Sequence, residues 1–339
     1  MVQRDGQQWL VALDAVTGKE LWATSLAPQY MNGMGNGPRG TPAIADNRVF
    51  AYTGEGILVA AQLADGKLLW SRNAVTSLKG KVAEYGMACS PLVLGKQVVV
   101  SVGAPSAAIA AFDAATGELA WKAGQDAAGY SSPAVLDVAG EKQIVAFTGG
   151  SAIGVAPTGK LLWRYEFETN FECNIATPIS VGANLFISSG ENHGSVLLDV
   201  KAAGGKFEVG EAWSSLGPKS VLRAEWQTPI LLDGHLYGFD NVGGAGPVTH
   251  LTCVDAKTGE RKWQVPRWGK GNAIAADGKL FISTMKGELV VARATAKEYQ
   301  EIGRVALFET TRQAPALAGG RLYLRDDQEI LCVDVRATK

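Results

Sequence analysis

The chain has 339 residues, and its 32 Lys and Arg against 33 Asp and Glu leave a formal net charge of −1. This balance provides no basic stripe of the kind that binds DNA, RNA or anionic lipid. Hydrophobic residues make up 47% of the chain, which excludes a disordered protein, and no apolar run reaches the roughly 18 residues of a membrane-spanning helix. The length exceeds the roughly 100–200 residues of an ordinary domain, which favours several domains or one repetitive architecture.

The first recognisable segment runs from Leu10 to Trp22 and reads Leu-Val-Ala-Leu-Asp-Ala-Val-Thr-Gly-Lys-Glu-Leu-Trp. Clear copies occupy residues 109–121 and 251–263, and weaker copies end at Trp70, Trp163 and Trp213. Six of the nine Trp therefore hold one repeat position, at spacings of 42–51 residues. A seventh copy near residues 289–305 has lost its Trp, and an eighth at residues 330–334 stops before that position.

A second segment begins with Thr41-Pro42-Ala-Ile and contains two apolar runs joined by a turn. Its counterparts begin at Ser90-Pro91, Ser132-Pro133, Thr177-Pro178, Thr228-Pro229 and Ala314-Pro315, and the copy at Ala273-Ile274 has Ala in place of Pro. Together the two segments give four short strands with alternating apolar residues. In the Asp-x-x-Thr-Gly link, Asp accepts backbone hydrogen bonds and Gly adopts a positive φ, which predicts a tight hairpin turn.

Units of four strands and roughly 40–45 residues are typical of propeller blades. We therefore expect an all-β fold, a β-propeller of four-stranded antiparallel blades, and a single domain over residues 1–339. No helix is expected, and residues 296–301 are expected to extend a hairpin. The predicted units are a partial first blade at 7–26 and blades at about 41–73, 90–124, 132–166, 177–216, 228–266, 273–307 and 314–336.

The Leu-x-Ala-Leu-Asp-x-x-Thr-Gly-x-x-x-Trp repeat resembles the PQQ-like (quinoprotein-type) β-propeller repeat family, which includes BamB-like and PQQ-binding-like bacterial proteins. Residues 32–42, 127–133 and 234–240 are similar to the same group, so the resemblance covers essentially the whole chain. It implies eight blades and a girdle of Trp side chains packed between neighbouring blades. The structural Trp residues would be Trp22, Trp70, Trp121, Trp163, Trp213 and Trp263.

The number of blades is open at this point, because the segments add up to 29 strands. Seven near-complete blades plus a partial N-terminal one fit the eight-bladed type, with three further strands expected upstream of Met1. The alternative is a seven-bladed propeller in which Glu20–Ser25 completes the last blade. An open sheet edge would invite aggregation, which favours a closed arrangement in either case.

Long and dissimilar loops connect each Trp strand to the first strand of the next unit. In a propeller the first strands line the central channel, so the residues before them are expected around one channel mouth. Arg, Trp, Tyr and Asn side chains in a concavity suit a polar, anionic or planar ligand, although ordinary loop positions explain the same residues. The candidates are Arg39, Tyr85, Tyr130, Asn174, Arg223, Glu225, Trp226, Trp268, Lys270, Asn272, Arg312 and Gln313.

Few residues suggest catalysis or metal binding. Three scattered His allow no Ser-His-Asp arrangement, and loop carboxylates such as Glu191 and Glu225 form no pair supported by spacing, so we predict neither catalytic residues nor metal ligands. Cys253 and Cys332 occupy a repeat position held elsewhere by Ala, which predicts small buried core residues. A disulfide between Cys89 and Cys173 is left open for an exported protein.

The function expected from these features is a non-catalytic scaffold that binds a protein or a small polar ligand through the channel-mouth loops, with no cofactor. The alternative is a PQQ-dependent quinoprotein alcohol dehydrogenase with Ca²⁺. The chain lacks the adjacent Cys pair and the blade insertions that the resemblance would then require. The resemblance also implies a periplasmic or otherwise exported protein, although residues 1–6 are polar and unlike a signal peptide. No nucleic-acid partner is expected, and oligomeric state is open.

Overall fold

The computed structural model describes residues 1–243 and 248–336. These residues form eight antiparallel sheets, six of four strands and two of three, and only two very short helices. The fold is an all-β, eight-bladed β-propeller with four-stranded antiparallel blades, so the predicted fold class is confirmed. None of the helices in the described part of the chain is long and apolar enough to cross a membrane.

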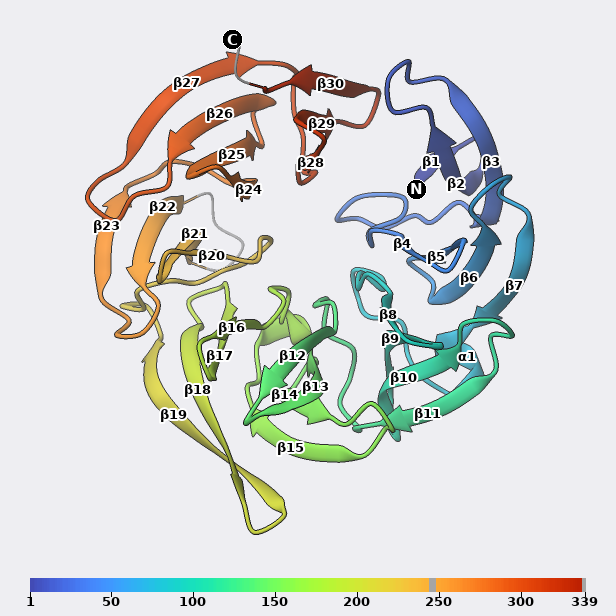
Figure 1. Cartoon of the computed structure of the whole chain (residues 1–339), viewed down its shortest axis with the longest axis horizontal. Coiled ribbons are helices and arrows are strands. Elements are labelled where there is room, and N and C mark those ends of the chain that lie inside the picture. The colour runs from blue at the N-terminus through green and yellow to red at the C-terminus, as the bar shows by residue number, and fades with distance from the viewer. Residues whose placement is uncertain (244–247, 337–339) are drawn as a thin grey trace. The chain divides into compact units, whose positions relative to one another are not determined.

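The chain divides into two compact units. The first contains Met1–Ile187 and Leu198–Gly210, and the second contains Ser188–Leu197 and the described chain from Glu211 onward. Within the first unit, Figure 1 shows the second, third and fourth sheets side by side, each with its last strand at the outer edge. The boundary between the units passes through the strands of the fifth sheet.

The first four sheets lie in the first unit and follow one another along the chain. Their strands are β1 (Val2–Arg4), β2 (Gln7–Leu13) and β3 (Glu20–Pro28); β4 (Ala43–Ala45), β5 (Arg48–Tyr52), β6 (Ile57–Gln62) and β7 (Leu68–Asn73); β8 (Leu92–Leu94), β9 (Gln97–Ala104), β10 (Ala107–Asp113) and β11 (Leu119–Ala123); and β12 (Ala134–Val138), β13 (Glu141–Phe147), β14 (Ser151–Val155) and β15 (Leu161–Glu166). The two helices are α1 (Ala74–Ser77) and the 3₁₀ turn η1 (Asn170–Glu172).

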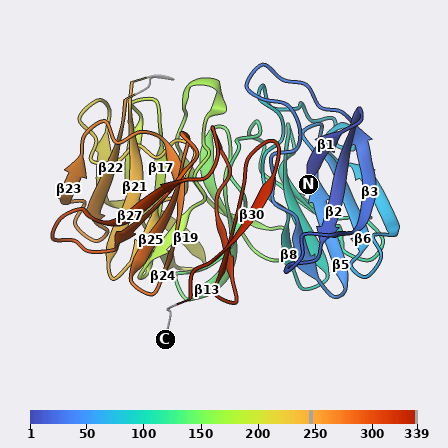
Figure 2. The ribbon, with the colours of Figure 1, turned by 90° about the horizontal axis from the view of Figure 1, so that it is seen from above.

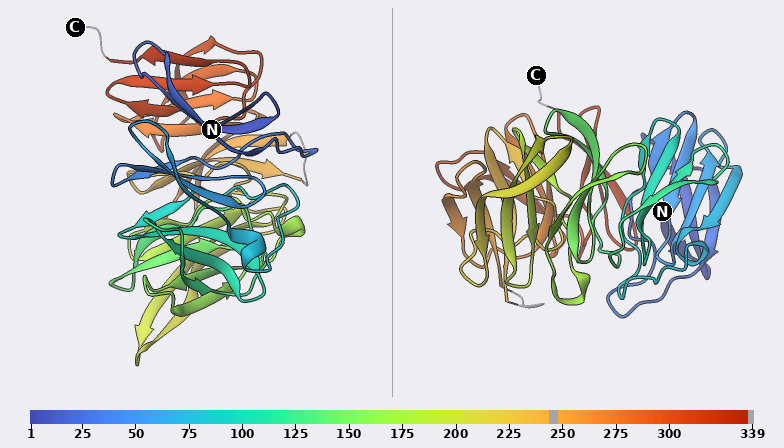
Figure 3. Two further views of the ribbon diagram at one scale, coloured as in Figure 1. Left: turned by 90° about the vertical axis from the view of Figure 1, so that its right-hand side faces the viewer. Right: turned by 90° about the horizontal axis from the view of Figure 1, so that it is seen from below.

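The fifth sheet ends in a long hairpin, whose tip stands clear of the first two strands of that sheet (Figure 3). Its strands are β16 (Ile179–Val181), β17 (Asn184–Ser189), β18 (Gly194–Ala203) and β19 (Lys206–Leu216).

The last three sheets lie in the second unit. Their strands are β20 (Ile230–Leu232), β21 (His235–Val242), β22 (Val248–Asp255) and β23 (Arg261–Val265); β24 (Gly271–Ala276), β25 (Lys279–Thr284), β26 (Glu288–Arg293) and β27 (Gln300–Ala306); and β28 (Ala316–Ala318), β29 (Arg321–Arg325) and β30 (Ile330–Asp334). Figure 2 shows β21, β22 and β23 side by side with β23 at the outer edge.

Proline sets the start of most first strands. Six of them begin at the residue directly after a Pro, as β4 does after Pro42. Proline cannot donate to a strand ladder, so pairing starts beyond it. Ala273 takes the Pro position in the seventh sheet, and there β24 begins two residues before this position, at Gly271, which pairs with Thr284.

The Asp-x-x-Thr-Gly turns have the predicted geometry. Asp14 Oδ1 accepts hydrogen bonds from the backbone N of Thr17 at 2.7 Å and of Val16 at 3.1 Å. These bonds, that of Thr17 first, lower the pKa of the Asp14 carboxyl. Gly18 closes the turn with a φ of 70°, a conformation that favours glycine.

The repeat Trp side chains reach the following sheet in several blades. Trp22 Nε1 donates to the carbonyl of Leu63 at 3.0 Å, Trp70 Nε1 to that of Ala114 at 3.1 Å, and Trp213 Nε1 to that of Ala256 at 3.1 Å. The indole ring also lies on the turn glycine of the hairpin that contains the accepting carbonyl. A Cβ added to Gly117, for example, would stand 2.7 Å from the Trp70 ring. We call this position between two sheets the tryptophan slot.

Three details differ from the sequence-based expectations. Strand β3 pairs with β2 at the edge of the first sheet, so the seven-bladed alternative, with Glu20–Ser25 in the last blade, is wrong. Strand β1 adds an edge strand that the repeat comparison did not contain. Helix α1 was also not expected; the Asn73 side chain begins it by accepting from the backbone N of Thr76 at 2.9 Å.

No disulfide links any of the four cysteines in the described parts of the chain. Cys89, Cys173 and Cys253 are buried, and no disulfide joins Cys89 to Cys173. The expectation of a buried Cys332 is wrong, because β30 is the outer strand of a three-stranded sheet and leaves this residue exposed. Burial raises the pKa of the Cys89 and Cys253 thiols to about 12, which disfavours their reactive thiolate forms.

We expect a thiol reagent at pH 8 to modify Cys332 rapidly and the other three cysteines only after unfolding. The raised pKa of Cys89 and Cys253 keeps them protonated, and burial keeps all three from the reagent. Mass spectrometry of alkylated peptides, with and without denaturant, measures the difference. The Cys332→Ser variant should lack the fast reaction, and fast native labelling of Cys89 would contradict this prediction.

Candidate functional site

The predicted loop residues fall into two groups, one in each unit. The first unit holds Arg39, Tyr85, Tyr130 and Asn174; the second holds Arg223, Glu225, Trp226, Trp268, Lys270, Asn272, Arg312 and Gln313.

Two tyrosines form an aromatic contact in the first unit. The rings of Tyr85 and Tyr130 are stacked, with centroids 5.8 Å apart and an interplanar angle of 26°. Phe171, whose side chain is exposed, adds a third ring 6.5 Å from that of Tyr85. The Tyr130 hydroxyl accepts from the backbone N of Tyr85 at 3.3 Å, and burial raises the pKa of this hydroxyl. These rings provide a partly open aromatic surface of neutral side chains.

Asn174 holds its own loop in place. Its amide Nδ2 donates to the carbonyls of Thr148 at 2.8 Å and Phe167 at 2.9 Å, and its Oδ1 accepts from the Thr169 hydroxyl at 3.2 Å. The side chain is fully buried. The interactions satisfy both ends of the amide, so the structure gives Asn174 a positioning role in the loop.

Arg39 contacts a residue that the sequence analysis did not select. Its guanidinium lies 4.9 Å from the centroid of the Tyr30 ring and donates to the carbonyls of Gly35 at 2.7 Å and Gly37 at 2.8 Å. Partial burial lowers the pKa of Arg39. The Tyr30 ring lies against Gly86, where an added Cβ would come within 2.6 Å of its hydroxyl. No local motif marks Tyr30, because its neighbours come from other loops.

A buried ion pair fixes the loop that follows β19. Arg223 Nε donates to Asp240 Oδ1 at 2.7 Å, and Arg223 Nη2 donates to Asp240 Oδ2 at 2.7 Å. Arg223 Nη1 also donates to the Pro218 carbonyl at 2.6 Å, and Gln264 donates to Asp240 Oδ2 at 3.1 Å. The two charged side chains are only 4% and 0% exposed. Arg223 was predicted as a ligand contact, whereas here its donors are used within the protein.

Residues from several loops and from β21 form a group that we call the Trp226 cluster: Glu225, Trp226, Asn241, Lys270 and Arg312. Lys270 Nζ donates to Glu225 Oε2 at 2.7 Å and lies 4.1 Å from the Trp226 ring centroid. The Arg312 guanidinium lies 5.3 Å from the same centroid. Asn241 Nδ2 donates to Glu225 Oε2 at 2.6 Å. Two cationic groups thus lie near one Trp ring, a favourable arrangement for each of them.

The Glu191 carboxyl interacts electrostatically with two residues of this cluster, Glu225 and Lys270. Its pKa is raised, first by burial and then by the nearby charge of Glu225, while Lys270 acts in the opposite direction. The sequence analysis placed Glu191 among the loop carboxylates without a partner. Buried oxygens of Asn241 and Thr249, on paired positions of β21 and β22, have no hydrogen-bond partner among residues 1–243 and 248–336.

Trp268 is a core residue of the second unit, whereas Asn272 supports the cluster. The Trp268 ring packs on Phe239, with centroids 5.6 Å apart, in the hydrophobic core between two sheets of the second unit. Asn272 Nδ2 donates to the Arg312 carbonyl at 3.0 Å and so holds the backbone of that residue. In the same turn the backbone N of Gln313 donates to the Thr311 hydroxyl at 3.1 Å.

A calcium-bound quinone would place specific demands on these residues. Calcium requires six to eight oxygen ligands. In the parts of the chain that the structure describes, no three His, Cys, Asp or Glu side chains are grouped for metal binding. Glu225 Oε2, the best-placed carboxylate oxygen, already accepts from an ammonium and an amide, and a cation beside it would meet the charge of Lys270. The Trp226 cluster therefore does not fit such a site.

Comparisons with known proteins agree with this fold. The family model described as "Outer membrane protein assembly factor BamB" matches residues 6–265 and 247–337. BamB from Moraxella catarrhalis has a similar structure, with a TM-score of 0.67 and 15% identity, over 98% of this chain and 94% of that one. A quinohemoprotein alcohol dehydrogenase from Comamonas testosteroni has a TM-score of 0.64 and 15% identity, over 94% of this chain and 67% of that one. At such identities these structures show a shared fold.

A curated relative matches in sequence over a shorter stretch. Quinohemoprotein alcohol dehydrogenase ADH IIB from Pseudomonas putida is 27% identical over 149 residues, which is 38% of this chain and 20% of that protein. The chain thus spans about a fifth of the length of that relative. The family model, in contrast, covers nearly the whole chain, and the protein belongs to the family described as outer membrane protein assembly factor BamB.

Proposed function

We propose that this chain is a non-catalytic β-propeller scaffold that binds another protein through the Trp226 cluster and the loops around it. The observation that carries the proposal is the placement of Lys270 and Arg312 near the partly buried Trp226 ring. Trp and Arg are the residue types that contribute most to binding at protein interfaces. A propeller supplies the rigid frame on which such loops are carried.

The pairing of the other polar groups supports a scaffold. Arg223 is bound to Asp240, Lys270 to Glu225, and Asn174 to two groups of its own loop and to the Thr148 carbonyl. Because these contacts already fix the side chains, the loops would lose little conformational entropy on binding a partner. We propose a periplasmic or otherwise exported location and a protein partner, in keeping with a family described as an outer membrane protein assembly factor.

We expect the Trp226→Ala variant to bind its partner at least tenfold more weakly than the native chain. Truncation of a central aromatic side chain costs about 2 kcal/mol or more in interfaces of this type. The partner is first identified by quantitative capture from cell-envelope extract on the tagged native chain. The dissociation constant is then measured by calorimetry with the two purified proteins.

Trp9→Ala is the matched control, because Trp9 lies in β2 and its Nε1 donates only to the nearby Arg4 carbonyl at 3.2 Å. This control should bind with the affinity of the native chain. Equal affinity of the Trp226→Ala variant would overturn the proposal. So would alcohol-dependent dye reduction by the native chain supplied with PQQ and Ca²⁺, because it would demonstrate a catalytic quinone site.

A further inference from the structure

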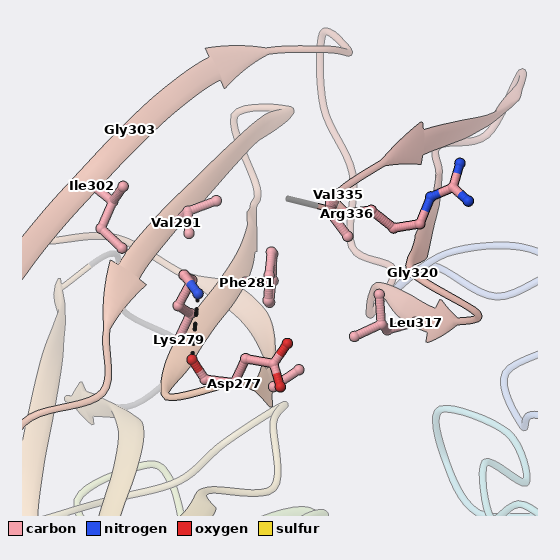
Figure 4. A pocket seen from close by; sticks show the side chains of 11 residues that line it. Asp277, Lys279, Phe281, Val291, Ile302, Gly303, Leu317, Gly320, Val335 and Arg336 are labelled. Carbon is pink, nitrogen blue, oxygen red and sulfur yellow. Dashed lines mark hydrogen bonds between the residues drawn. The ribbon is translucent and has the colours of Figure 1, made fainter. Parts of the chain in front are cut away.

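A cavity of about 560 Å³ lies in the second unit, between the sheet β24–β27 and the last sheet, β28–β30. Phe281, Val291 and Leu317 form apolar walls, and Asp277 and Lys279 stand at one end (Figure 4). Its volume lies within the roughly 300–1,000 Å³ of small-molecule sites. None of these residues belongs to the Trp226 cluster.

One wall of the cavity is a glycine at the repeat position of tryptophan. Gly303 in β27 pairs with Val291, as Trp263 pairs with Cys253 and as Trp70 pairs with Ala60. In all three sheets the register shifts directly after this pair. An added Cβ at Gly303 would meet no atom of the described residues within 4 Å. The cavity is therefore a tryptophan slot in which the chain provides no indole ring.

The hydrogen-bond acceptor of the slot is present as well. In two earlier sheets the Trp acceptors, Leu63 and Ala114, donate their backbone N to the turn residues Asn47 and Lys96. Val335 makes the equivalent bond, its backbone N donating to the Gly320 carbonyl at 3.0 Å. The carbonyl of Val335 thus takes the position at which the other slots accept an indole N–H.

We propose that this slot binds an indole-type ring from outside the blade, seated between Val291 and Leu317 with its N–H directed to the Val335 carbonyl. Apolar cavities of proteins bind aromatic molecules of matching shape, because the ring leaves water and gains contacts on both faces. The other slots show that this geometry accepts an indole. The ring could be a free indole compound or the Trp side chain of a peptide, and both share the recognised chemistry.

The test is a calorimetric titration of the native chain with indole, 1-methylindole and N-acetyl-tryptophanamide. We expect indole to bind and 1-methylindole, which lacks the N–H, to bind at least fivefold more weakly. Tighter binding of N-acetyl-tryptophanamide than of indole assigns the slot to a peptide Trp, and the reverse order assigns it to a free indole compound. No binding of indole, or equal binding of indole and 1-methylindole, overturns the proposal.

The Gly303→Trp variant locates the binding. Its own ring should fill the slot, weaken indole binding at least tenfold and raise Tm by about 3 °C. Gly210→Trp is the matched control, since Gly210 also lies in an outer strand and an added Cβ there would meet only the Asp199 carbonyl, at 3.9 Å. This control should bind indole as the native chain does. Unchanged indole binding by the Gly303→Trp variant would place the ligand elsewhere and overturn the proposal.

Discussion

Replacing Asp240 with Ala should lower the free energy of unfolding by about 3–5 kcal/mol. The substitution leaves the Arg223 guanidinium, only 4% exposed, without the carboxylate that accepts two of its hydrogen bonds at 2.7 Å. A buried charge without its partner carries its full desolvation cost, and the loop that contains Glu225 and Trp226 would lose one of its attachments to β21. Urea denaturation followed by Trp fluorescence measures the loss.

Two further variants distinguish the effect of breaking the buried ion pair from the effect of removing any charged side chain. Glu20→Gln breaks the Arg4–Glu20 pair, in which both side chains are more than 40% exposed, and should cost no more than about 1 kcal/mol. The double variant Arg223→Met with Asp240→Leu should recover most of the loss, because neither charge then remains buried. If Asp240→Ala lowered the free energy of unfolding no more than Glu20→Gln does, the buried pair would contribute no more to stability than an exposed pair.

The architecture was predictable because its determinants are local. The Asp14 carboxylate, the Gly18 turn and the Pro before six of the first strands act within a few residues of themselves, so they repeat visibly along the chain. The regular return of Trp then gave the blade length. Strand β1 and helix α1 escaped prediction because neither repeats: one pairs only with β2, and the other depends on a single Asn73 cap.

The candidate site was predictable only as a set of loops. Arg223 has the residue type of a ligand contact, but its role depends on Asp240, which is seventeen residues further along in a buried strand. Tyr30 was missed for the same reason, since the side chain of Arg39 and the backbone at Gly86 approach it from different loops. The repeat pattern places such residues in loops at one end of the blades. The fold then determines which of them pair with one another and which stay available to a partner.

The sequence repeat and the strand register both identify a missing Trp in the seventh sheet. The sequence comparison shows that the copy near residues 289–305 lacks Trp, and the register identifies Gly303 as the substituted position. A gap in a repeat is uninformative by itself, because a blade can be repacked with other apolar side chains. The cavity beside Gly303 shows that no described side chain of this blade has filled the space.

The contribution of a filled slot can be measured at Trp70, where replacement by Ala should cost about 3–5 kcal/mol of unfolding free energy. The side chain is 7% exposed, packs on Phe50 with ring centroids 6.1 Å apart, and donates to the Ala114 carbonyl at 3.1 Å. Its loss would leave a cavity between two sheets and an unpaired carbonyl. Trp70→Phe keeps most of the ring but removes the N–H, so its cost should fall to about 1–3 kcal/mol. Denaturant unfolding of both variants checks this order, and a Trp70→Ala loss below about 1 kcal/mol would mean that the slot adds little to the cohesion of neighbouring blades. The Gly303→Trp variant then acts as the reciprocal experiment, because the same ring should stabilise a sheet junction that lacks it.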